Sequence, residues 1–227
     1  MSERPGPAIH DRVMPQLDAL ALQAGRPLVI TDADEVLFLF LQGFEAYLED
    51  NGHYLDLSSF ALVGNIKNAA TEEMAPVEMA KALLDGFFAE RTESMTPVPG
   101  AAEALAALAL KAQILVLSNL PEGSRKARER ALAAAGMPYP IVANVGLKGP
   151  VVRHLADLVQ APVYFLDDIP HNHTSVAQAA PDVQRVHFVA DPRLARLIGP
   201  AEHCHHRVDD WAEVRALIER ELADLGW

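Results

Sequence analysis

Short apolar runs recur along the chain, each bounded by glycine, proline, polar or charged residues. Their length and composition predict buried strands at residues 27–30, 113–117, 140–143, 162–166 and 186–189. Between them, apolar residues recur at the three- and four-residue spacing of amphipathic helices, at residues 101–109, 122–136, 151–160, 171–180 and 211–225. Strands that alternate with helices predict an α/β fold, in which a Rossmann-like parallel sheet is flanked by helices on both sides.

Residues 38–98 break this alternation. Apolar positions there fall on two helical faces, one made of Phe40, Phe44, Tyr47 and Leu48 and the other of Val77, Ala80, Leu84, Phe87 and Phe88. No convincing strand is predicted in this interval, and prolines and a glycine mark its end at residues 96–100. The pattern predicts an α/β core of residues 1–37 and 99–227, with a small helical cap of residues 38–98 inserted after the first strand. Such an insertion usually lies over the ligand crevice of the sheet.

The composition is that of an ordinary globular protein. Of the 227 residues, 50% are hydrophobic and 22% are charged, which suits one core and a smaller second unit. No apolar stretch approaches the ~20 residues needed to span a bilayer, and the polar N-terminus does not resemble a secretory signal. The single cysteine, Cys204, excludes an internal disulfide. We expect a cytoplasmic protein with no membrane partner, and the oligomeric state stays open.

The chain is acidic, with 19 Lys and Arg against 31 Asp and Glu and a formal net charge of -12. It has no basic stripe long enough to follow a phosphate backbone, so we expect no nucleic-acid partner. The same charge would repel an anionic substrate unless a cation or local basic groups reversed the potential at the site. A bound metal ion would do so.

Two carboxylates, Asp32 and Asp34, follow the first predicted strand, where a parallel sheet binds its ligands. A carboxylate can attack phosphorus, while a second carboxyl group protonates the departing oxygen and then deprotonates water. This chemistry suits Asp32 as nucleophile and Asp34 as general acid and base. Aspartates also cap helices and turns after strands, so the pair alone leaves that alternative open.

Other predicted strand ends and helix starts carry residues that suit phosphoryl chemistry. Ser118 and Asn119 end the second strand, and either can donate to a phosphoryl oxygen or simply cap the next helix. Lys148 precedes a predicted helix, where its ammonium group would neutralise charge on a nucleophile; the alternative is a solvated loop lysine. Asp167 and Asp168 end an apolar strand, and adjacent acids there favour Mg²⁺, which takes oxygen ligands.

These sites fall at the ends of different predicted strands, which a parallel sheet brings to one edge. The chain resembles the haloacid dehalogenase-like hydrolase superfamily in four motifs, here Asp32-Ala33-Asp34-Glu35-Val36, Ser118, Lys148 and Asp167-Asp168. The resemblance covers nearly the whole chain and implies an inserted helical cap of the C1 type. It implies Mg²⁺ held by Asp32, the backbone carbonyl of Asp34 and an acid of the 167–168 pair. It also implies that Ser118 and Lys148 anchor the phosphate and the nucleophile.

The second aspartate separates activities within that superfamily. Members that cleave carbon–halogen bonds resemble this pattern but do not keep Asp34, whereas phosphatases and phosphomutases do. The resemblance therefore predicts a Mg²⁺-dependent phosphatase that hydrolyses a small phosphorylated metabolite through an aspartyl-phosphate on Asp32. Two alternatives stay open: a phosphomutase or phosphotransferase, in which another hydroxyl replaces water, and a catalytically silent protein that binds a metal or a partner.

Several histidines could suggest a second metal site. Residues 203–206, His-Cys-His-His, resemble a soft-metal cluster, but no further ligand lies nearby, so we expect a terminal strand or loop. His171 and His173 follow the acidic pair, and we expect both on a helix surface. Asn172 either supports the metal site or caps that helix.

The predicted cap contains one polar cluster, made of Asn65, Lys67 and Asn68. These side chains can meet the head group of a substrate. A solvated loop explains them equally well, so the sequence leaves both interpretations open.

Overall fold

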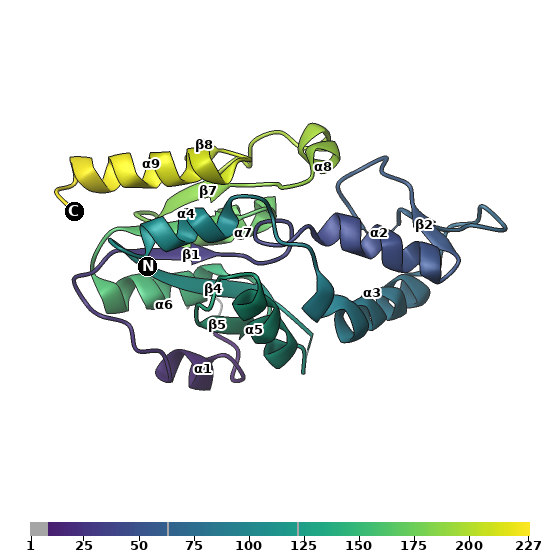
Figure 1. Ribbon diagram of the computed structural model, residues 1–227, viewed down its shortest axis with the longest axis horizontal. Helices are drawn as coiled ribbons and strands as arrows, with labels where there is room; N and C mark the ends of the chain where they lie inside the picture. The colour runs from purple at the N-terminus through teal and green to yellow at the C-terminus, as the bar shows by residue number, and fades with distance from the viewer. Residues whose placement is uncertain (1–8, 63, 122) are drawn as a thin grey trace, which may run out of the picture.

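The core of the computed structural model, which describes residues 9–62, 64–121 and 123–227, is a six-stranded sheet. The strand order is β5-β4-β1-β6-β7-β8, and every neighbouring pair is parallel (Figure 1). The strands are β1 (Leu28–Thr31), β4 (Gln113–Asn119), β5 (Ile141–Asn144), β6 (Val163–Asp167), β7 (Gln184–His187) and β8 (His206–Arg207). The predicted parallel α/β sheet is confirmed, and β1 lies centrally with β4 and β6 as its neighbours.

Helices cover both faces of this sheet, because alternate strand residues point to opposite sides. Leu28 and Ile30 pack with apolar residues of α1, α6 and α7, whereas Val29 packs with those of α4, α5 and α9. Figure 1 shows α4 and α9 on one side of the sheet and α1 and α6 on the other. The helices are α1 (Met14–Asp18), α4 (Ala101–Leu108), α5 (Arg125–Ala134), α6 (Gly149–Val159), α7 (Pro170–Ala179), α8 (Pro192–Leu197) and α9 (Trp211–Asp224).

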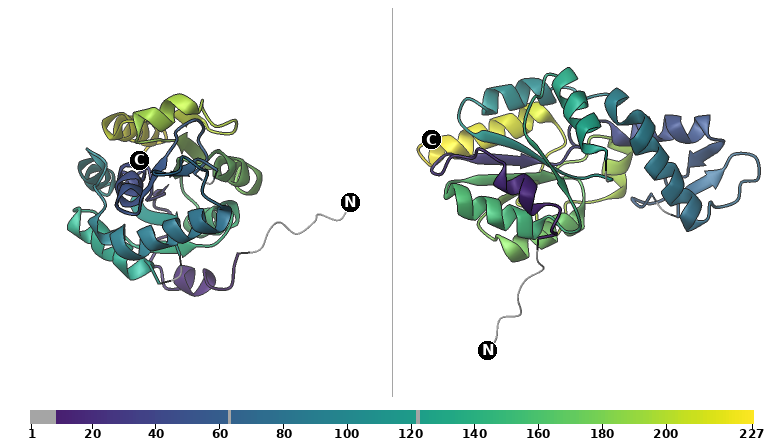
Figure 2. Two further views of the ribbon diagram at one scale, coloured as in Figure 1. Left: turned by 90° about the vertical axis from the view of Figure 1, so that its right-hand side faces the viewer. Right: turned by 90° about the horizontal axis from the view of Figure 1, so that it is seen from below.

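The segment between β1 and α4 forms a separate layer at one end of the core (Figures 1 and 2). It contains α2 (Phe40–Asp50), β2 (His53–Leu55), β3 (Ile66–Asn68), α3 (Val77–Arg91) and the 3-10 helix η1 (Thr92–Ser94). The two long helices were predicted, and their aromatic faces meet: Phe87 makes edge contacts with Phe40 and Phe44 at centroid distances of 5.3 and 5.4 Å.

The expectation that this segment contains no strand is wrong. β2 and β3 pair antiparallel, with Tyr54 opposite Lys67. Each strand has only three residues, and a single residue of each, Leu55 and Ile66, is buried. Strands this short contain too few alternating positions to give a period-two signal. The division at residues 38 and 98 between a core and a cap remains a prediction.

The two places where the chain passes between the core and this segment lie side by side. Leu39 donates its backbone N–H to Thr96 O at 2.8 Å, and Val98 donates to Leu37 O at 2.8 Å. The outgoing and returning chain therefore brace each other just beyond the carboxyl end of β1.

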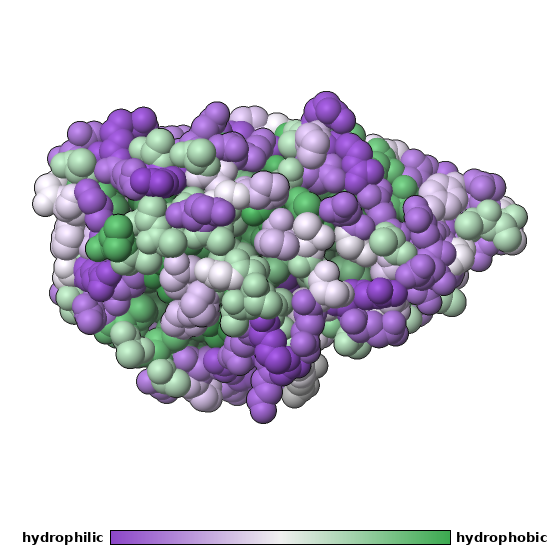
Figure 3. Space-filling view, viewed as in Figure 1, coloured by the Kyte–Doolittle hydropathy of each residue, from purple (hydrophilic) through white to green (hydrophobic). Residues whose placement is uncertain are grey.

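The surface is mixed in character. In the view of Figure 3, hydrophilic residues cover much of the rim, and hydrophobic ones show between them over the sheet-bearing part. Within the described residues, no helix is long and apolar enough to cross a membrane.

Candidate active site

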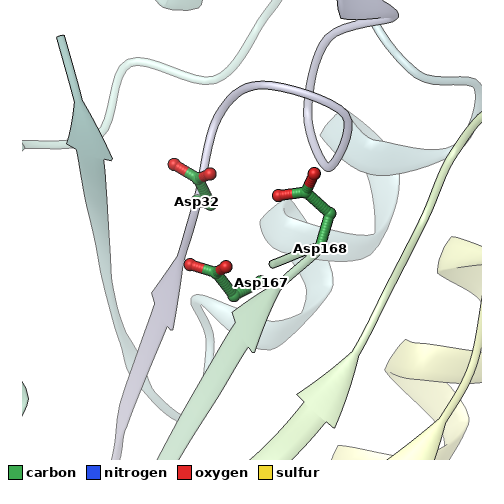
Figure 4. Close-up of side chains that lie close together, drawn as sticks. All are labelled: Asp32, Asp167 and Asp168. Atoms are coloured by element: carbon green, nitrogen blue, oxygen red, sulfur yellow. The ribbon is translucent and has the colours of Figure 1, made fainter. Parts of the chain in front are cut away.

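Three carboxylates meet at the carboxyl ends of β1 and β6. Asp32 follows β1, Asp167 ends β6 and Asp168 follows it, and the sheet places β1 and β6 side by side. One carboxylate oxygen of each residue lies within 4.8 Å of the others, and all three residues are buried (Figure 4). The structure thus brings Asp32 together with an acidic pair more than a hundred positions later in the sequence, as the parallel sheet predicted.

Lys148 lies among these acids. Its Nζ is 2.9 Å from Asp32 Oδ1 and 2.6 Å from Asp167 Oδ2, and the side chain is 1% exposed. Burial alone would lower the pKa of Lys148, but the charges of Asp167 and Asp32 raise it above its ordinary value. The predicted lysine is therefore a fixed cation and not a solvated loop residue.

The start of α6 sets the position of Lys148. Lys148 is the residue before the first turn, and Gly149 packs directly on α7, where its N–H donates to Ser175 Oγ at 3.1 Å. A Cβ at position 149 would lie 2.3 Å from Ser175 O. Only glycine allows α6 to approach α7 this closely, which places the ammonium group beneath Asp32.

The two acids of the Asp167–Asp168 pair differ in their partners. Asp167 is satisfied by the protein: Oδ2 accepts from Lys148, and Oδ1 accepts from Ile169 N at 2.9 Å and from Asn172 Nδ2 at 3.0 Å. The carboxylate of Asp168 has no hydrogen-bond or ion-pair partner among the described residues, and it faces the cavity that Asp32 also lines. Asp168 is thus the member of the pair that is free to bind a ligand.

The charges of this cluster suit a divalent cation. Burial raises the pKa of Asp168 well above its ordinary value, and the neighbouring Asp167 and Asp32 raise it further. Burial also raises the pKa of Asp32, although Lys148 opposes the shift. Three acids with one ammonium leave excess negative charge when all are ionised, and oxygen ligands are those that Mg²⁺ takes. Asp32 and Asp168 fit this role directly, with Asp167 and Asn172 behind them.

Asp34 lies apart from the acidic cluster and pairs with Arg128, which is not among the predicted site residues. Arg128 Nη2 of α5 donates to Asp34 Oδ1 at 2.5 Å, and the Arg128 side chain is fully buried, with its guanidinium carbon 4.9 Å from the centroid of the Phe38 ring. Burial raises the pKa of Asp34 and the Arg128 charge opposes that shift. A carboxyl group with a raised pKa stays protonated to a higher pH, which is what a general acid requires.

A signal for Arg128 is present in the sequence. It lies on the inward face of α5 with Ala131 and Leu132, three and four positions later, where an apolar residue is expected. A buried arginine at such a position requires an acidic partner.

Ser118 and Asn119 end β4 and line the same cavity as Asp32 and Lys148. The Ser118 hydroxyl is buried and has no hydrogen-bond partner in the described part of the protein, so it is available to a ligand. Asn119 is tied into the fold instead: its Nδ2 donates to Gly146 O at 3.0 Å and its Oδ1 accepts from Asn144 at 2.7 Å. Ser118 is therefore the better candidate for contact with a phosphoryl group.

Two buried histidines support the Asp167–Asp168 main chain. His173 Nε2 lies 2.9 Å from Asp167 O, and His187 Nε2 lies 2.9 Å from Asp168 O. Burial lowers the pKa of each to about 4, so both rings are neutral and each Nε2–H donates. The expectation of a surface position is wrong for His173, because α7 turns that residue towards β6; it holds for His171, which is exposed and lines the cavity.

The remaining polar candidates have structural partners. Lys67 Nζ pairs with Asp56 at 2.6 Å, Asn65 Nδ2 donates to Ala61 O at 2.6 Å, and Asn68 Oδ1 accepts from Ala70 N at 2.9 Å. None of the three lines the cavity.

Two side chains of the histidine-rich segment also have structural partners. His206 pairs with Glu221 at 2.9 Å, and His205 Nδ1 accepts from Arg185 N at 3.0 Å. Asp32, Asp167 and Asp168 are the one metal-ligand group found within the described residues.

Comparisons with known proteins bear on the fold of the chain. No protein-family model and no curated protein sequence matched the chain. Solved structures did match the chain. A conserved haloacid dehalogenase-like protein of unknown function from Agrobacterium tumefaciens is similar with a TM-score of 0.61 and 17% identity, over 87% of this chain and 100% of that one.

Two further structures extend this similarity. A haloacid dehalogenase family hydrolase from Deinococcus radiodurans, solved with phosphate and sodium, has a TM-score of 0.59 and 18% identity over 87% of this chain and 97% of its own. A β-phosphoglucomutase-like protein from Thermotoga maritima has a TM-score of 0.56 and 15% identity, over 86% and 99% of the two chains. At these identities the likeness concerns the fold. The chain therefore has the fold of the haloacid dehalogenase-like hydrolases.

Proposed function

We propose that this protein is a Mg²⁺-dependent phosphatase that hydrolyses a small phosphomonoester through an aspartyl-phosphate on Asp32. The observation that carries the proposal is the convergence of Asp32, Asp34, Ser118, Lys148 and Asp168 on one cavity of about 300 Å³. Its size lies at the lower end of ligand pockets, which suits a small substrate. The phosphate bound in the similar structure from Deinococcus radiodurans supports the same class of ligand.

The residues around the cavity have different roles in substrate binding. Lys148 and the free hydroxyl of Ser118 approach the phosphoryl oxygens. The Lys148 ammonium also orients Asp32 and, by opposing the effect of burial on its pKa, favours the ionised form of that carboxylate. A Mg²⁺ ion held by Asp32 and Asp168 would supply the further positive charge that two anions need in order to approach each other. Asp167, Asn172 and His173 keep this arrangement rigid.

The reaction then needs two displacements. Asp32 attacks phosphorus with a carboxylate oxygen, the bond from phosphorus to the ester oxygen breaks, and Asp34 gives its proton to the leaving alkoxide. Asp34, now ionised, removes a proton from water, which attacks the phosphoryl group and releases phosphate while Asp32 is regenerated. Arg128 holds the Asp34 carboxyl group at the side of the cavity.

The proposal is tested by phosphate release from a panel of phosphomonoesters, with Mg²⁺ and with excess EDTA. We expect release that EDTA abolishes and that Asp32→Asn lowers by several orders of magnitude, while the circular dichroism of the variant stays native. Transfer of phosphate to an added alcohol instead of water would indicate a phosphotransferase. Full activity of Asp32→Asn would refute the assignment.

A further inference from the structure

The cavity at the strand ends has two walls of different chemistry. The core provides the charged and polar groups described above. Five residues of the segment between β1 and α4 provide the opposite wall: Phe40, Phe60, Leu62, Leu84 and Phe88. All five are apolar, and Leu194 and Ile169 from the core extend the apolar wall. A bound phosphoryl group at Asp32 would therefore direct its organic group towards hydrocarbon.

The apolar wall is supported from behind. Phe40 and Phe88 are 8% and 7% exposed, and their ring centroids lie 5.8 Å apart. Both rings pack on Phe87, which is fully buried between α2 and α3. Leu84 is only partly buried, so its side chain offers open surface to the cavity. Packing on Phe87 therefore fixes the two phenylalanine rings of the wall.

Among the described residues of 38–98, no polar side chain lines the cavity. Lys67 is paired with Asp56, and Asn65 and Asn68 bond to nearby backbone groups. Glu35, where the segment leaves the core, also lines the cavity, but its carboxylate accepts from Leu41 N and Asp191 N at 2.8 Å each. The described part of residues 38–98 therefore offers no side-chain donor or cation to the hydroxyl groups of a substrate.

We propose, on the basis of the phosphatase function proposed above, that the substrate is the phosphate ester of a small apolar alcohol and not a sugar phosphate. Hydroxyl groups of a sugar that face the apolar wall would lose water and gain no partner from that wall, which disfavours binding. A short aliphatic or aromatic group would instead bury its surface against Phe40, Leu84 and Phe88.

The test measures binding without turnover. A series of n-alkylphosphonates from methyl to hexyl, which cannot be hydrolysed at a P–O–C bond, is titrated into the Mg²⁺-loaded protein by calorimetry. We expect affinity to rise by up to about fourfold for each methylene that the cavity buries. Butylphosphonate should bind more tightly than 3-hydroxypropylphosphonate, of nearly equal size, by on the order of tenfold to a hundredfold.

Two variants assign the effect to the apolar wall. Leu84→Asn places an amide in the wall, so the preference for butylphosphonate over its hydroxylated analogue should fall several-fold. Leu158→Asn, at a solvent-exposed position on α6 outside this cavity, should leave the preference unchanged.

The outcomes separate this inference from the proposed function. Affinity that is independent of chain length, or equal for the butyl and hydroxypropyl compounds, would overturn the inference even if Asp32-dependent phosphate release is observed. If affinity rises with chain length but butyl phosphate is never hydrolysed while other esters are, the substrate class is wrong. If no ester at all is hydrolysed, the phosphatase function falls and the substrate class with it.

Discussion

At the scale of single residues, Lys148 connects the parts of the site. Its ammonium group bridges Asp32 and Asp167, so it links the candidate nucleophile to the acid that orders Asn172 and the β6 loop. Lys148 was predicted as a site residue because it precedes a helix in the sequence. The double ion pair was not predictable, because it depends on how closely α6 packs on α7.

Replacing Lys148 tests this linkage through stability. Lys148→Met leaves two buried carboxylates without their cation, so the free energy of unfolding without divalent ions should fall by about 3–5 kcal/mol. Urea denaturation in EDTA measures it, and Lys126→Met, at an exposed position of α5, is the control. A loss no larger than that of Lys126→Met would show that the ion pairs do not stabilise the fold.

Arg128 gives a prediction about pH. The Arg128 charge lowers the pKa of Asp34 against the effect of burial, so Arg128→Met lets that pKa rise. A general acid acts only while protonated, and the alkaline limb of the kcat/KM profile should therefore move to higher pH. Lys126→Met should leave the limb in place. An unmoved limb in Arg128→Met would mean that Asp34 is not the acid that limits the reaction.

At the scale of elements, the sequence predicted what depends on local pattern. Five core strands and five core helices were found, because buried strands are continuous apolar runs and these helices are periodic. They are β1, β4, β5, β6 and β7, and α4, α5, α6, α7 and α9. The sequence pattern missed the strands β2 and β3, of three residues each, and the helices α1 and α8, of five and six residues, because elements this short show too few periodic positions. For residues 203–206 it left a strand and a loop open, and β8 begins at His206. It also missed the inward turn of His173, because a histidine at a buried helical position looks the same in sequence as one in solvent.

The approach of α6 to α7 gives a prediction at this scale. In Gly149→Ala the new Cβ would lie 2.3 Å from Ser175 O and 2.4 Å from Ser175 Oγ, so one helix has to shift. We expect a loss of about 1–3 kcal/mol in the free energy of unfolding. Weaker phosphate binding should accompany it, since Lys148 precedes Gly149. Gly199→Ala, with no atom within 4 Å of the new Cβ, is the matched control. Equal stability of the two variants would contradict the close packing.

At the scale of the whole molecule, ion pairs join the two layers on either side of the cavity. Arg193 of α8 donates to both carboxylate oxygens of Glu45 on α2, at 2.9 and 2.6 Å, and Arg130 of α5 pairs with Glu93 of η1. These pairs lie at the surface, where each is worth little alone. Together with the two hydrogen bonds between residues 37–39 and 96–98, these pairs hold the apolar wall opposite the acids. No local sequence pattern encodes that placement.

Metal binding should be visible in the stability of the whole chain. Mg²⁺ should bind only the folded site, so a saturating concentration should raise the melting temperature. At a hundredfold excess of Mg²⁺ over its Kd, the free energy of unfolding should increase by about 2.7 kcal/mol. Asp168→Asn should abolish this rise. In EDTA the Asp168→Asn variant should have a higher melting temperature than the wild type, because the repulsion of the Asp168 carboxylate by Asp32 and Asp167 is relieved. Asp157→Asn, at an exposed position, should respond like the wild type. An undiminished Mg²⁺ effect in Asp168→Asn would exclude Asp168 as a ligand.

The central claim is that Asp32 carries the phosphoryl group. Its most direct test is peptide mass spectrometry of protein quenched in acid during turnover of a phosphomonoester that it hydrolyses. The account predicts one phosphoryl group on Asp32, present in a larger fraction of molecules in Asp34→Asn, where water is no longer activated. Steady release of phosphate with no phosphoryl group ever found on Asp32 in either protein would contradict it.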